Sequence, residues 1–174
     1  MFKSFEEDKV LRFREFDDAR DFVENFKDDK DTYESIDYMI NHKEYYFLLK
    51  NILKQLNTKK NILAYLFFNM PCLKREEDLG LIIDILKNSD EILKKIIIDY
   101  IKSCENREFA KKIFESGLKV EAIEICKKFP DIERYLKEKL KNEKDLNVLK
   151  KAIEFFEIYD EDYVEKLKDK LGNK

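Results

Sequence analysis

The fold is decided by one stretch of the chain, residues 79–101, which read LGLIIDILKNSDEILKKIIIDYI. Apolar residues recur three and four positions apart on both sides of the polar break at residues 87–91, and this spacing predicts two amphipathic helices joined by a short turn. The break contains Asn, Ser and Asp, which are residue types that cap helix starts. Neither helix of such a pair covers its own apolar face, so the pair needs neighbours to stack against.

The apolar pattern of this pair also occurs thirty residues earlier in the chain. In the first helix, the residues that correspond are Leu49, Ile52, Leu53 and Leu56 with Leu79, Ile82, Ile83 and Leu86. In the second helix they are Ile62, Leu63, Leu66, Phe67 and Met70 with Ile92, Leu93, Ile96, Ile97 and Tyr100. Self-similarity at such a period indicates repeated helix pairs. The alternative is coincidence, because thirty residues are close to about eight helical turns and any amphipathic helices would partly align.

Apolar periodicity and helix breakers extend the helical prediction along the chain. Helices of the repeats are predicted at about residues 43–56, 59–70, 75–88, 90–104, 107–116, 119–128, 131–142, 145–158 and 160–171. An N-terminal cap over residues 1–40 is expected to contain short helices at about 4–15, from residue 17, and at 32–40. Pro71 and Pro130 stop helices, and Gly117 suits a helix C-terminus. Short connections make successive helices antiparallel, so the fold class is all-α, in one domain over residues 1–174 with the repeats at 43–171.

The second helix pair resembles a short HEAT-like repeat, most clearly over residues 75–104. Such repeats have an apolar first helix, a polar turn with an aspartate, and then an aliphatic residue followed by a basic one. Asp90, either Ile92 or Leu93, and Lys94 occupy those places. The resemblance implies an α-solenoid-like architecture, a short right-handed stack of antiparallel helix pairs with about 30 residues per repeat. It is a resemblance to a family of repeats and not to one specific protein.

Composition supports a helical, well-solvated fold. Hydrophobic residues make up 44% of the chain and charged residues 42%, which excludes simple disorder and is typical of exposed amphipathic helices. With three glycines and two prolines, the chain has little of the turn chemistry that β-rich folds use. Lysine outnumbers arginine and Gln55 is the only glutamine. This pattern is thermophile-like, although an AT-rich genome would produce a similar bias.

Charge, cysteine content and hydropathy restrict the partners and the compartment. The net charge is −3 and no segment is strongly basic, which disfavours nonspecific nucleic-acid binding. Three cysteines with long spacings argue against a disulfide framework and favour a reducing, cytoplasmic location. The longest apolar run, residues 62–68, is far shorter than the roughly 20 residues that span a bilayer, so we expect no membrane segment.

No catalytic, cofactor or metal-binding motif is found in the sequence. His42 is the only histidine, and no CxxC or HxxxH pair anchors a metal site. The glycines are isolated, so no phosphate-binding loop is present. Cys72 follows Pro71 in an expected turn and is therefore the candidate exposed thiol, whereas Cys104 and Cys126 lie at apolar helix edges. No cofactor is expected.

Three functions remain open at this level. The first is a noncatalytic protein–protein interaction or scaffold module whose partner is another protein or a second copy of the chain. The second is a nucleic-acid-binding repeat protein, and the third is an enzyme of unknown class. The candidate contact residues for the first two are four lysines that recur with the repeat and would form a ridge on the second helices: Lys59, Lys60, Lys94 and Lys95.

Aromatic residues gather in the first 70 positions, which is typical either of a bulky capping core or of an aromatic groove with an acidic rim that docks a basic or amphipathic segment.

Overall fold

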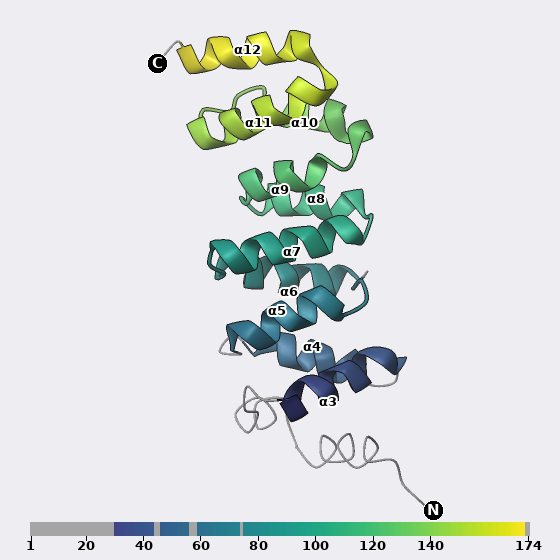
Figure 1. The fold of residues 1–174 in the computed structure, drawn as a ribbon. Helices are drawn as coiled ribbons and strands as arrows, with labels where there is room; N and C mark the ends of the chain where they lie inside the picture. The colour runs from purple at the N-terminus through teal and green to yellow at the C-terminus, as the bar shows by residue number, and fades with distance from the viewer. Residues whose placement is uncertain (1–29, 44–45, 56–58, 74, 173–174) are drawn as a thin grey trace, which may run out of the picture. The chain divides into compact units, whose positions relative to one another are not determined.

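A computed structural model describes residues 30–43, 46–55, 59–73 and 75–172 (Figure 1). Throughout these residues the regular elements are helices and no strand occurs, so the all-α prediction is confirmed for this part of the chain. The short helices expected before residue 30 lie outside the described residues. The contacts divide the chain into two compact units, residues 1–100 and 101–174, where the sequence predicts one domain. The boundary between the units falls within one helix, α7 (Glu91–Ser103).

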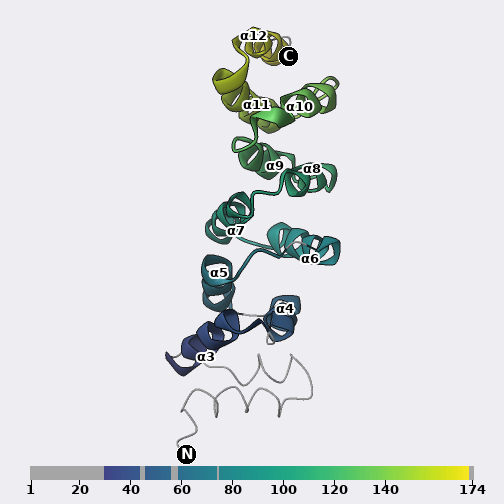
Figure 2. The same ribbon diagram turned by 90° about the vertical axis from the view of Figure 1, so that its right-hand side faces the viewer.

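The first unit contains two rows of helices (Figure 2). Its helices before α7 are α3 (Lys30–Asn41), α4 (Tyr46–Lys54), α5 (Lys60–Asn69) and α6 (Glu76–Lys87). One row consists of α3, α5 and α7, and the other of α4 and α6. Helix α3 packs against both α4 and α5, and α4 packs against α6. The rings of Phe67 on α5 and Tyr100 on α7 meet edge to face at 5.2 Å between centroids, which holds α5 and α7 side by side.

The second unit repeats this arrangement. It contains α8 (Arg107–Glu115), α9 (Lys119–Cys126), the 3-10 helix η2 (Pro130–Ile132), α10 (Glu133–Lys139), α11 (Leu146–Tyr159) and α12 (Glu161–Gly172). Helix α9 packs against α8 and α11, and α11 packs against α12. The Tyr135 hydroxyl on α10 donates to the Lys111 carbonyl of α8 at 3.3 Å, so α8 and α10 are also joined in this unit.

Helix boundaries follow the capping chemistry of the sequence. The Asp90 carboxylate accepts from the Leu93 N–H at the start of α7 at 3.0 Å, and Asp145 accepts from the N–H groups of Asn147 and Val148 at the start of α11. Such contacts satisfy donors that a helix start leaves without partners. Gly117 has φ +95° just after α8, a left-handed conformation in which glycine avoids the strain of a side chain.

Most of the described apolar positions in the thirty-residue pattern are buried, whereas Ile83 and Ile96 are half-buried and Ile92 is exposed. Leu49, Leu79, Leu63 and Leu93 are all buried, as the thirty-residue pattern predicts. Ile92 is 76% exposed although its counterpart Ile62 is 3% exposed. Ile92 lies in the first turn of α7, whose Leu93 and Ile97 are buried, so an equivalent position in the sequence pattern does not guarantee burial here.

Candidate interaction surface

The four candidate lysines lie at the same end of two neighbouring helices of the first unit. Lys59 and Lys60 are at the start of α5, and Lys94 and Lys95 are in the first turn of α7. The Lys60 ammonium contacts the Asp90 carboxylate at 2.5 Å, which joins the starts of α5 and α7. Because Phe67 and Tyr100 meet at the other ends of these helices, the two helices run parallel.

Acidic side chains neutralise part of this lysine group. Lys60 pairs with Asp90, and Lys94 contacts Glu91 at 3.4 Å. The hydrogen bond from Lys60 and the one from the Leu93 N–H hold the pKa of Asp90 below its ordinary value. Lys59 and Lys95 are exposed. The ridge is therefore a surface of mixed charge, because carboxylates stand among its ammonium groups.

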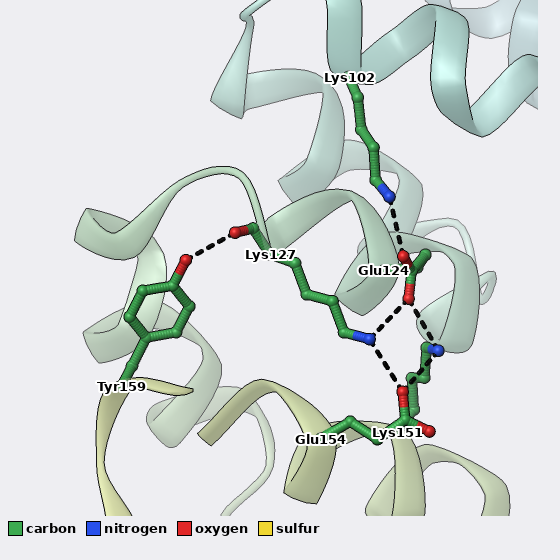
Figure 3. Close-up of polar contacts among 6 residues, drawn as sticks. All are labelled: Lys102, Glu124, Lys127, Lys151, Glu154 and Tyr159. Carbon is green, nitrogen blue, oxygen red and sulfur yellow. Dashed lines mark hydrogen bonds and ion pairs between the residues drawn. The ribbon is translucent and has the colours of Figure 1, made fainter. Parts of the chain in front are cut away.

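A network of ion pairs occupies the corresponding helices of the second unit. Glu124 on α9 contacts three ammonium groups, those of Lys102, Lys127 and Lys151, at 2.7–2.9 Å (Figure 3). Glu154 on α11 contacts Lys127 at 2.8 Å and Lys151 at 2.7 Å. Burial opposes ionisation of Glu124, but the hydrogen bonds from the three lysines outweigh burial and lower the pKa of Glu124 to about 2. The ion pairs between these carboxylates and lysines join α9 to α11.

The sequence analysis missed this network, although a signal for it is present. Glu124 and Glu154 are thirty residues apart, at the same position of successive repeats, and each has a lysine three residues away, Lys127 and Lys151. Pairs at this spacing face each other on a helix. Together, the two spacings place Glu124 on α9 and Glu154 on the neighbouring α11. Both carboxylates contact the same two lysines, Lys127 and Lys151.

The outward side of α3 and α5 carries an aromatic surface with a carboxylate. The Tyr65 hydroxyl donates to Asp37 at 2.6 Å, and the Tyr33 and Tyr65 rings lie 4.7 Å apart between centroids. Phe68 follows Tyr65 by three residues and is 70% exposed. The sequence indicates many aromatic residues in this region, but which of them reach solvent depends on the packing of α3 beside α5.

The prediction of an exposed thiol at Cys72 is wrong. Cys72 is half-buried and disulfide-bonded, and Cys104 is also disulfide-bonded, so the expectation that the cysteines form no disulfide is wrong as well. Spacing along the chain is a poor guide here, because disulfide formation depends on three-dimensional position. Cys126 is the free cysteine and is buried in α9, where burial raises the pKa of its thiol to about 12. A thiol of this kind behaves as a small apolar side chain.

Two further properties belong to the described residues. No three His, Cys, Asp or Glu side chains converge there in a way that could hold a metal ion. Among the described helices, none combines the length and the apolar character that crossing a bilayer requires.

Comparisons of the chain with protein-family models, with curated proteins and with solved structures find no match.

Proposed function

We propose that this chain is a noncatalytic protein–protein interaction module in which the second helices of stacked, HEAT-like pairs offer the contact surface. The observation that carries the proposal is the 70% exposed ring of Phe68 on α5. Phe68 lies on the same face of α5 as Tyr65, and aromatic side chains are enriched in the surfaces through which proteins bind one another. Ile92 at the start of α7 adds a second exposed apolar side chain in the same row of helices.

The stacked architecture is supported by contacts between helices that are one repeat apart. In the first unit, α4 packs against α6 and Lys60 contacts Asp90 thirty residues away. In the second unit, α9 packs against α11 and Lys127 contacts Glu154. Contacts that recur at this spacing are those expected when each repeat binds its neighbours.

Charge favours a protein partner over a nucleic acid. Polyphosphate backbones are bound by lysine and arginine faces that release counterions. In the candidate ridge, Asp90 and Glu91 contact Lys60 and Lys94, and these carboxylates would repel phosphates. Nucleic-acid binding through Lys59 and Lys95 is the second candidate function, because both lysines are exposed.

Site-specific photo-crosslinking tests the proposal. The full chain is produced in its native host with a photoreactive phenylalanine analogue in place of Phe68. A matched control carries the analogue at Asp84, an exposed position on α6 in the other row of the same unit. We expect position 68 to form a discrete adduct with protein, resistant to nuclease, and position 84 to form none. Equal adducts at both positions, or no protein adduct at position 68, would contradict the proposal.

A second measurement separates the nucleic-acid alternative. Binding of a labelled single-stranded or duplex oligonucleotide is followed while the salt concentration is raised, for the native chain and for a variant with Lys59, Lys60, Lys94 and Lys95 all changed to alanine. The interaction-module proposal predicts weak binding that the four substitutions do not change. Tight binding with a steep salt dependence that the variant loses would support nucleic-acid recognition instead.

A further inference from the structure

One carboxylate of the first unit has an unusual environment. Asp37 on α3 is exposed, and its side chain accepts a hydrogen bond from the Tyr65 hydroxyl at 2.6 Å. Across the described residues no lysine or arginine forms an ion pair with Asp37, whereas its neighbour Glu34 pairs with Lys30 at 3.2 Å. Asp37 therefore keeps an uncompensated negative charge at the surface.

Aromatic groups surround this charge. The Tyr33 and Tyr65 rings are tilted by 60° at 4.7 Å between centroids, so they form one aromatic surface across α3 and α5. Phe68 lies three residues after Tyr65 and four after Ala64, which places the three side chains on one face of α5. We call the surface formed by Tyr33, Asp37, Ala64, Tyr65 and Phe68 the α3–α5 patch.

The part of the patch around Asp37 and the part around Phe68 favour different side chains of a binding partner. A carboxylate near aromatic rings favours a cationic partner group, because the carboxylate charge and the faces of the rings both attract cations. The exposed Phe68 ring and the Ala64 methyl group favour an apolar side chain. The hydrogen bond to Asp37, burial and the Asp37 charge raise the pKa of Tyr65 to about 12. The hydrogen bond from the Tyr65 hydroxyl to Asp37 keeps the ring of Tyr65 in place.

We propose that the α3–α5 patch docks a basic amphipathic peptide segment of a partner protein. An apolar side chain of the segment packs on Phe68 and Ala64, and a lysine or arginine lies beside Asp37 and the Tyr65 ring. This inference rests on the proposed function and names the class of partner. A nucleic acid does not suit the patch, because Asp37 repels phosphate. A second copy of the patch does not suit it either, because the patch contains no lysine or arginine that could pair with the Asp37 of the other copy.

Two labelled helical peptides provide the test with the full chain. Both have leucine along one face; the other face carries lysine in the first peptide and glutamate in the second. Fluorescence anisotropy is expected to show the lysine peptide binding at least about tenfold more tightly than the glutamate peptide. Asp37→Asn, which keeps an acceptor for Tyr65, and Phe68→Ala are each expected to weaken the lysine peptide about fivefold.

Matched controls use exposed residues outside the patch. Asp84→Asn removes an exposed carboxylate from α6, and Ile158→Ala removes a side chain from α11 that is 63% exposed. Both are expected to leave the lysine peptide affinity within about twofold. Circular dichroism melting of every variant verifies that the fold is retained.

Several results would overturn the inference. These are equal binding of the two peptides, no binding of the lysine peptide up to its solubility limit, or equal losses of affinity for the lysine peptide in the patch variants and the control variants. Sedimentation that shows a dimer of the native chain, lost on Phe68→Ala, would assign the patch to a second copy. If photo-crosslinking at position 68 captures a protein while the lysine peptide fails, the inference falls and the proposed function stands.

Discussion

The Tyr159 hydroxyl donates a hydrogen bond of 2.6 Å to the main-chain carbonyl of Lys127, joining the end of α11 to the end of α9 in the second unit (Figure 3). The last carbonyls of a helix have no partner within that helix. Carbonyls at or just after helix ends in both units accept from side chains about 26–30 residues later: Tyr100 donates to Pro71, Lys128 to Lys102, and Lys170 to Leu140. These contacts join the ends of helices that are distant in the sequence.

Replacing Tyr159 by phenylalanine removes this cap and keeps the ring. We expect a loss of about 1 kcal/mol in the free energy of unfolding, because a half-buried carbonyl loses its donor. Tyr46→Phe is the control, since the Tyr46 side chain forms no hydrogen bond in the described part of the chain. Urea unfolding followed by circular dichroism measures both. Equal stability of Tyr159→Phe and the native chain would show that the cap contributes nothing.

Glu124 is expected to make stability depend on pH in a defined window. Its pKa of about 2 in the folded chain lies below the ordinary value of 4.5, so the ionised form favours folding. The contribution is complete above pH 4.5 and is lost as the pH falls toward 2. Glu124→Gln should therefore lower the free energy of unfolding by about 1–2 kcal/mol at pH 7, after allowance for solvent screening, and by much less at pH 3.

The control for Glu124 is Glu138→Gln, because Glu138 is exposed on α10 and forms no ion pair among the described residues. Urea unfolding at pH 7, 5 and 3 gives the two pH profiles. Parallel profiles for Glu124→Gln and the native chain would contradict the assignment, since they would mean that Glu124 titrates alike in the folded and unfolded states.

Two glycines are expected to respond oppositely to alanine. Gly117→Ala places a side chain at φ +95°, so it should destabilise the chain by about 1 kcal/mol. Gly80 lies within α6, and a Cβ there would meet no atom within 4 Å. Gly80→Ala should stabilise the chain by about 0.5–1 kcal/mol, because alanine restricts the unfolded chain more than glycine does. Thermal melting of the two variants verifies the opposite signs; shifts in the same direction would refute the conformational explanation.

A buried ion pair joins α4 to α6 in the first unit. The Lys50 ammonium contacts Asp78 at 2.6 Å, and Asp78 is 4% exposed. Asp78→Ala should destabilise the chain by about 2 kcal/mol, because it leaves the mostly buried Lys50 with only the weaker contact to Glu77. The double variant Lys50→Met, Asp78→Leu should recover most of this loss, whereas Asp84→Ala on the exposed side of α6 should have little effect. A double variant less stable than Asp78→Ala would contradict this account. Chemical denaturation measures all three.

Much of the local structure could be predicted from sequence because it depends on neighbours along the chain. Asp90 caps α7 and Gly117 ends α8 at positions that residue type alone indicates. The predicted helix at residues 131–142 is instead a 3-10 turn followed by the shorter α10. Pro130 starts that turn, and tertiary packing rather than periodicity decides how far the helix continues.

The candidate surface could be predicted only in part. The sequence identifies Lys60 and Lys94 as recurring with the repeat, but it does not reveal that Asp90 and Glu91 contact them. Aromatic enrichment near the N-terminus is visible in the sequence. The selection of Phe68 as an exposed ring, beside the Tyr65 contact to Asp37, follows from the packing of α3 against α5.

By itself, the sequence determined that this protein is built of amphipathic helices, because apolar spacing and capping residues act over a few neighbouring positions. Only the tertiary structure decided which side chains meet across helices. The Tyr65 contact to Asp37 spans 28 residues and the Tyr159 contact to Lys127 spans 32. Such pairings depend on how helices pack, and the same apolar periodicity is compatible with many packings, so periodicity cannot select among them.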